Sequence, residues 1–142
     1  MSANSSQQSL NGVRCLNIED EAQYFYESSG YQLPTDAQII LSCDDHSGFH
    51  WDGEYYIVFD TSNEKVKKYL ETSLWNTTWK RGPIPQKISF HTGLSKWENS
   101  KFDSSSIWYL ADDQNTLIPF HNGRLMVINS EKNRILYSEW DF

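Results

Sequence analysis

Two strand-like segments joined by a long polar connection constrain this fold more than any other feature of the chain. Residues 37–43 and 55–59 are rich in β-branched and aromatic side chains, which favour strands. The eleven residues between them, 44–54, are more than a tight turn needs. Phe49 and Trp51 give this connection apolar side chains that can anchor it. We therefore expect a hairpin whose long loop is ordered without a metal ion.

The charge of the chain is divided between its two halves. Residues 15–64 hold eleven acids and no Lys or Arg, whereas residues 65–101 hold eight bases and two acids. The net charge of −7 argues against nucleic acid as a ligand. Because like charges repel, the acids need an offset. Either the basic region folds against the acidic half, or a basic partner binds to it.

The N-terminal part of the chain predicts an arm and a helix. Residues 1–11 are polar, so we expect a disordered arm followed by one domain over 12–142. Asn17 as N-cap and Gly30 as C-terminal stop bound a predicted helix. Acids at 19–21 suit its first turn, where the helix dipole favours them. Its buried stripe is expected to contain Ile18, Ala22, Phe25 and Tyr26.

The remaining elements are mainly strands. A short helix is predicted over 64–72, with Val66, Tyr69 and Leu70 facing inward. Strands are predicted at 84–90, 107–111, 116–120, 124–129 and 134–142, the last two as a hairpin. Alternation in the last strand places Leu136, Ser138, Trp140 and Phe142 on one face and Tyr137, Glu139 and Asp141 on the other. The predicted fold is α+β, a single domain with a mainly antiparallel sheet and one or two short helices.

Cysteine usage and hydropathy bear on the compartment. Cys15 and Cys43 form no CxxC motif, and we predict two buried free thiols, with a disulfide as the alternative if the protein is exported. No run approaches the ~20 apolar residues of a membrane span, and no apolar segment follows Met1. We therefore predict a cytoplasmic protein without a membrane span. An exported or lipid-tethered protein whose signal has been removed is the alternative.

The 44–54 connection is the candidate site because it concentrates acids and imidazoles. Carboxylates and imidazoles are metal ligands, but no HExxH or closed ligand spacing is present. Aspartates also cap backbone groups in loops. We predict a binding loop without metal or cofactor, and a metal-binding or hydrolytic domain is the alternative. The candidate binding residues are Asp44, Asp45, His46, His50, Trp51, Asp52 and Glu54.

The chain shows no catalytic motif that we can identify. It contains no GxSxG and no glycine-rich phosphate loop, and Cys43 ends an apolar strand where a thiol is expected to be buried. We therefore predict that the protein is not an enzyme. Trp75, Trp79 and Trp97 are predicted to cover the core from loops, with an interface anchor as the alternative.

The connection also resembles a known pattern. Leu33-Pro34, a strand, Asp44-Asp45-His46 and the residues 48–54 are similar to a group of small uncharacterised bacterial proteins with a DDHGGFHGDGE-like loop. Ser47 and Trp51 stand where that pattern has glycine. The resemblance implies a bacterial origin and no particular activity.

The function that these features predict is binding. We expect a non-enzymatic bacterial protein-binding domain, such as an immunity protein that neutralises a basic toxin through complementary charge. The alternatives are a metal-binding or hydrolytic domain that uses residues 44–54, and an exported envelope domain. The oligomeric state is left open.

Overall fold

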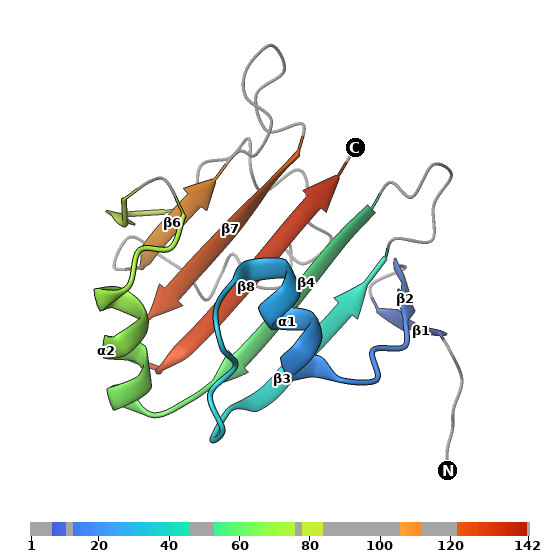
Figure 1. Cartoon of the computed structure of the whole chain (residues 1–142), viewed down its shortest axis with the longest axis horizontal. Helices are drawn as coiled ribbons and strands as arrows, with labels where there is room; N and C mark the ends of the chain where they lie inside the picture. Colours follow the sequence, from blue (N-terminus) through green and yellow to red (C-terminus); the bar gives the residue numbers. More distant parts are fainter. Residues whose placement is uncertain are drawn as a thin grey trace.

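Eight strands pair in one antiparallel sheet, and two helices pack against it (Figure 1). The computed structural model describes residues 7–10, 13–45, 53–75, 78–83, 106–111 and 122–141. The strand order is β1-β2-β3-β4-β8-β7-β6-β5. The predicted α+β class with a mainly antiparallel sheet is confirmed. The elements are β1 (Gln7–Leu10), β2 (Val13–Leu16), α1 (Glu21–Ser29), β3 (Gln38–Asp44), β4 (Gly53–Asp60), α2 (Asn63–Glu71), β5 (Lys80–Arg81), β6 (Ile107–Ala111), β7 (Asn122–Asn129) and β8 (Arg134–Asp141).

The predicted strands agree with β3, β4, β6, β7 and β8 to within two residues at each end. The segments 84–90 and 116–120 lie outside the described residues. One prediction was wrong, because residues 7–10 of the expected disordered arm form β1 and pair with β2. Strand pairing is made by backbone groups, and an edge strand tolerates polar side chains, so composition alone does not exclude it.

Alternation along the central strands builds two apolar layers. In β4, residues 53–59 are all buried, and alternate residues belong to different clusters. Tyr55 and Ile57 join the cluster that also contains residues of α1 and α2. Tyr56 and Val58 join the opposite cluster, and in β8 the pair Leu136 and Trp140 does the same while Tyr137 faces the helices. The predicted two-face division of the last strand is confirmed for these three residues of β8.

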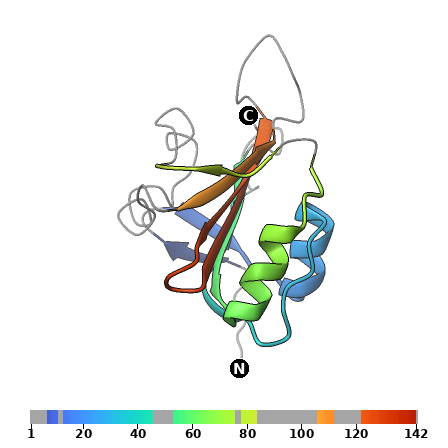
Figure 2. The ribbon, with the colours of Figure 1, turned by 90° about the vertical axis from the view of Figure 1, so that its left-hand side faces the viewer.

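Both helices lie on the same side of the sheet (Figure 2). In α2, Ser62 caps the first turn, and Val66 and Tyr69 are buried as predicted. Trp75 is buried and Trp79 packs against the same cluster, so these two tryptophans cover the core. Trp97 lies outside the described residues. Neither helix of the described part has the length or the apolar character that crossing a bilayer requires.

The first helix begins later than predicted. Asp20, not Asn17, is the N-cap, and its Oδ1 accepts a hydrogen bond from the Gln23 N–H at 3.0 Å. Gly30 ends the helix as predicted, with φ of 84° and its N–H donating to the Tyr26 carbonyl at 2.8 Å.

The predicted buried stripe of α1 was partly wrong. Phe25 is buried, but Tyr26 is 53% exposed and Ala22 is also exposed. Ile18 packs against the core from outside the helix. Because the helix has few apolar residues, its pattern does not determine a face. The Phe25 ring contacts with the sheet select the orientation instead.

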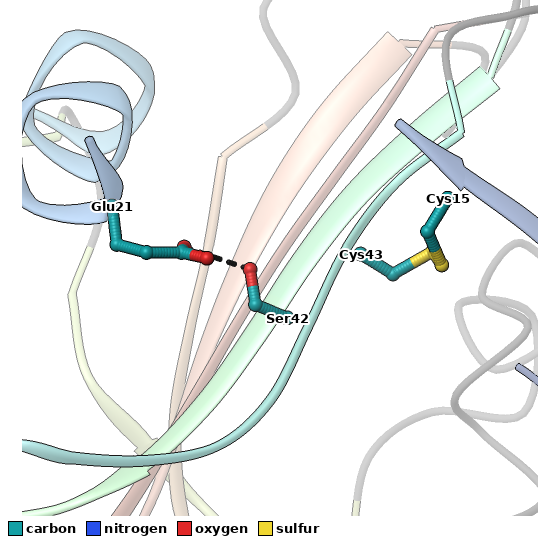
Figure 3. Close-up of a disulfide and its surroundings, with 4 residues drawn as sticks. All are labelled: Cys15, Glu21, Ser42 and Cys43. Carbon is teal, nitrogen blue, oxygen red and sulfur yellow. Dashed lines mark hydrogen bonds between the residues drawn. A yellow bond between two sulfur atoms is a disulfide. The ribbon is translucent and has the colours of Figure 1, made fainter. Parts of the chain in front are cut away.

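The two cysteines form a disulfide between β2 and β3 (Figure 3). Their Cα atoms are 4.9 Å apart, and both residues are buried. The prediction of buried thiols was therefore correct about burial and wrong about the free state. β2 contacts β3 through the register pair Leu16 and Asp44, which brings the neighbouring cysteines together. No local pattern in the sequence encodes that strand adjacency.

Candidate functional site

The structure describes three of the seven predicted binding residues. Asp44 ends β3, Asp45 follows it, and Glu54 is the second residue of β4. The Asp45 N–H donates to the Glu54 carbonyl at 2.7 Å, which continues the β3–β4 hairpin into the base of the loop. The other four predicted residues, His46, His50, Trp51 and Asp52, lie outside the described residues.

Asp44 and Glu54 face opposite sides of the sheet. Asp44 is 5% exposed and accepts a hydrogen bond from Tyr24 Oη of α1 at 2.5 Å. Glu54 is 7% exposed and pairs in register with Trp140, which belongs to the cluster on the face away from the helices. Burial raises the pKa of Tyr56 on that face, and the charges of Glu54 and Asp45 raise it further. The predicted acid cluster is therefore divided between two environments.

The sheet brings a different set of acids together beneath α1. We call this set the carboxylate–tyrosine cluster; its members are Glu21, Tyr24, Asp44, Tyr55, Tyr137 and Glu139. The Tyr24 and Tyr55 ring centroids are 4.6 Å apart, and those of Tyr55 and Tyr137 are 5.9 Å apart. Tyr55 is paired with Asp44 on one side and with Glu139 on the other, so the register of β3, β4 and β8 assembles the cluster.

Hydrogen bonds hold the acids of this cluster. Ser42 Oγ donates to Glu21 Oε1 at 2.8 Å, and Figure 3 shows Ser42 pointing toward α1 while Cys43 points the other way. Tyr137 Oη is 2.9 Å from Glu139 Oε1 and 3.1 Å from the Ser28 carbonyl oxygen. These bonds fasten α1 to β3 and β8 by polar contacts as well as by apolar packing.

Burial and the neighbouring carboxylates raise the pKa values of the phenols. For Tyr24, burial is the larger cause, followed by its hydrogen bond to Asp44. For Tyr55, burial comes first and the charge of Glu21 second. Burial also raises the pKa of Tyr137, with Glu139 adding to it. The phenols are therefore protonated at neutral pH.

The described residues contain no group suited to a metal ion. No three of their His, Cys, Asp and Glu side chains come together in a way that could hold one. Among the residues that the structure describes, Tyr55 Oη has no hydrogen-bond partner although the side chain is fully buried. The carboxylates of the cluster accept hydrogen bonds from hydroxyl groups or lie beside phenols. The hydrogen bonds between α1 and the strands β3 and β8 position the helix on the sheet.

Sequence reasoning missed Tyr24 as the hydrogen-bond partner of Asp44, and it missed that Glu21, Tyr137 and Glu139 join the same cluster. Glu21 was interpreted as a first-turn acid stabilised by the helix dipole, which is correct for its position in α1. The alternation in the last strand placed Tyr137 and Glu139 on one face, which indicated that these two side chains lie close together. What the sequence lacked was the information that β8 lies beside β4.

Glu21 provides a prediction about pH. Burial raises the pKa of Glu21 above its ordinary value of 4.5, and the Ser42 hydrogen bond opposes this in part. The stability that this group contributes is therefore present below the unfolded-state pKa and is lost as pH rises through the folded-state pKa. We expect Glu21→Gln to change the free energy of unfolding more favourably at pH 7 than at pH 4. The amide has no charge to bury at either pH, and it can still accept the hydrogen bond from Ser42.

The measurement is the free energy of unfolding of both proteins in urea at the two pH values. Glu27→Gln, at an exposed position of the same helix, is the control and should show little change between them. A Glu21→Gln variant that is less stable than wild type by the same amount at pH 4 and pH 7 would contradict the expected sign.

Four exposed acids lie between β2 and the start of β3, a segment without Lys or Arg: Glu19, Asp20, Glu27 and Asp36. Glu64, Glu71 and Glu131 are exposed elsewhere in the described structure. Within the described part of the chain none of the four acids between β2 and β3 forms an ion pair, whereas Asp60 pairs with Arg134 at 2.8 Å.

The described bases of the 65–101 region lie on α2 and on β5, and Lys65 and Lys68 of α2 line one pocket together with Gly30 and Thr35, which follow α1. The bases of β5, Lys80 and Arg81, are at the opposite end of the strand order, five strand positions from β3. At ~4.8 Å per strand this is roughly 24 Å, beyond the ~10 Å over which exposed charges interact in salt. Those two bases are therefore distant from the acids beside β3. On α2, Lys67 and Lys68 are exposed.

Comparison of the chain with family models, with characterised proteins and with solved structures finds no match.

Proposed function

We propose that this chain is a non-enzymatic bacterial protein-binding domain whose acidic half binds a basic protein, as an immunity protein binds a basic toxin. The observation that carries the proposal is the set of four exposed acids between β2 and β3 (Glu19, Asp20, Glu27 and Asp36), which form no ion pair within the described residues. Complementary charge accelerates association and selects against acidic partners. A basic partner also relieves the mutual repulsion of the acids.

The contact residues of this proposal differ from those expected from sequence. Asp44 and Glu54 are buried, so neither carboxylate offers much surface to a partner. The four exposed acids, Glu19, Asp20, Glu27 and Asp36, replace them as the first contacts. Asp45 is half-buried at the base of the β3–β4 loop and stays a candidate at the margin of the surface.

The disulfide supports the exported alternative for the compartment. Disulfides persist in oxidising compartments such as the bacterial periplasm and are rare in the cytosol. Cys15 and Cys43 are joined and buried, which is typical of a structural disulfide. We therefore propose an exported protein that meets its basic partner in an oxidising compartment.

The test compares two doubly substituted variants of equal net charge. Glu19→Gln/Glu27→Gln removes two exposed acids from the α1 region, and Glu71→Gln/Glu131→Gln removes two exposed acids from the end of α2 and the β7–β8 turn. Both change the net charge from −7 to −5. Proteins retained from a source-cell extract are identified by mass spectrometry, and their association rates are measured across a range of salt concentrations.

We expect the retained proteins to be basic and to associate several-fold more slowly with the α1 variant, while the control variant stays close to wild type. The difference should shrink as salt rises, because exposed charges are screened. Equal rates for the two variants, or partners without a positive charge, would contradict the proposal.

A further inference from the structure

The outer edge of β3 is open in the described structure. β3 pairs with β4 along its length, but β2 meets it only through Leu16 and Asp44. Figure 1 shows β1 and β2 beside the C-terminal end of β3 only. Within the described part of the chain, residues 38–42 therefore have no neighbouring strand on this side. An edge of this kind presents backbone donors and acceptors that can pair with another chain.

Two exposed isoleucines lie on this edge. Ile39 is 40% exposed and Ile40 is 39% exposed, and they are two of the four large apolar side chains exposed in the described structure. The register with β4 shifts between Ile39 and Leu41, which makes Ile40 the extra residue of a β-bulge. Lysine, proline and a bulge are separate devices that protect an edge against pairing. Residues 38–44 carry the bulge but contain no lysine or proline, so the edge is bent at Ile40 and carries no positive charge.

The surroundings of the edge are acidic. Asp36 is exposed two residues before β3 begins, Glu21 reaches Ser42, and Asp45 follows the end of the strand. No Lys or Arg occurs anywhere in residues 15–64. Pairing with a second copy of this chain through β3 would place two acidic edges side by side, which like-charge repulsion disfavours. A strand that carries positive charge is instead attracted to this acidic edge.

We infer that the outer edge of β3 binds an extended basic segment of the partner, which adds to the sheet as a further strand. The inference rests on the proposed function and adds a place and a backbone conformation to it. Main-chain hydrogen bonds to residues 38–42 supply affinity in this mode of recognition. Apolar side chains of the segment cover Ile39 and Ile40, and its Lys or Arg residues lie toward the acids around the edge.

The test uses three synthetic peptides of equal charge. The first alternates Lys and Val over eight residues and has blocked ends. The other two have the same sequence with N-methyl groups on every other amide, one in each of the two possible frames, so that each loses the donors of one edge and keeps the charge. Binding to the disulfide-intact protein is measured by fluorescence anisotropy at low and at physiological salt. We expect the unmodified peptide to bind at least about tenfold more tightly than the weaker methylated form, because two or more backbone hydrogen bonds are lost.

Two substitutions of equal charge locate the peptide on the protein. Ile40→Lys places a positive charge on the edge, and Leu74→Lys places one at another exposed apolar residue, 54% exposed, after α2. We expect Ile40→Lys to weaken binding of the unmodified peptide about tenfold or more, and Leu74→Lys to change it less than about threefold. Circular dichroism spectra and unfolding curves of both variants establish that they are folded.

The outcomes separate the edge from the broader function. If all three peptides bind equally and with the same salt dependence, charge alone is recognised, so the edge inference fails while the proposed function stands. If Ile40→Lys and Leu74→Lys weaken binding equally, the peptide does not occupy β3, and the inference also fails. If sedimentation shows a dimer of the wild type that Ile40→Lys dissociates, the occupant is a second copy of the chain, and the basic segment is excluded. If no basic peptide binds at low salt, both the inference and the charge argument fail.

Discussion

Reduction of the Cys15–Cys43 disulfide is expected to lower the free energy of unfolding by about 3–4 kcal/mol. The bond joins residues separated by 28 positions, and a cross-link of that span removes conformational entropy from the unfolded chain to about this extent in the loop-closure model. It also holds β2 to β3, which otherwise share only the Leu16–Asp44 register pair. The β1–β2 hairpin should therefore be the first part of the sheet to separate after reduction.

The measurement is equilibrium unfolding in urea with and without a phosphine reductant. A protein of this size should also lose roughly 10 °C in melting temperature. The double variant Cys15→Ala/Cys43→Ala is the control, since its unfolding should not respond to the reductant. Identical midpoints for the oxidised and reduced wild type would show that the bond contributes nothing to stability.

Phe25→Ala is expected to destabilise the protein by about 3–5 kcal/mol, the usual range for truncating a buried phenylalanine. The Phe25 side chain is fully buried, and its ring meets Phe59 and Tyr137 edge to face at centroid distances of 5.6 and 5.5 Å. These contacts fasten α1 to β4 and β8. Truncation leaves a cavity between the helix and the sheet that the surrounding rings cannot fill without moving.

The adjacent residue is the matched control. Tyr26 is 53% exposed, so Tyr26→Ala should cost less than about 1 kcal/mol, as is usual for a surface substitution. Both substitutions remove one ring from the same helix and can be compared by urea denaturation. Similar losses for the two variants would mean that α1 is rotated relative to the arrangement described above.

The sequence by itself determined the elements that depend on local chemistry. The β-branched and aromatic residues of β4 predicted that strand, and the alternation in β8 predicted its two faces, because strand side chains point to opposite sides in turn. Gly30 predicted the end of α1, because glycine readily adopts the left-handed conformation found there. The start of α1 was not determined in this way, because Asn17 and Asp20 are both suitable N-cap residues and the helix begins after Asp20.

The tertiary structure decided everything that depends on which strands are neighbours. The β4–β8 pairing brings Glu139 beside Tyr55, and the β2–β3 contact brings Cys15 to Cys43. Neither adjacency leaves a periodic trace in the sequence, because the partners are far apart along the chain. The same geometry placed Asp44 and Glu54 on opposite faces, since the residues that end β3 and begin β4 follow the alternation of their own strands. Composition revealed the acidic half, but only the fold showed which of its acids are buried among tyrosines and which are exposed.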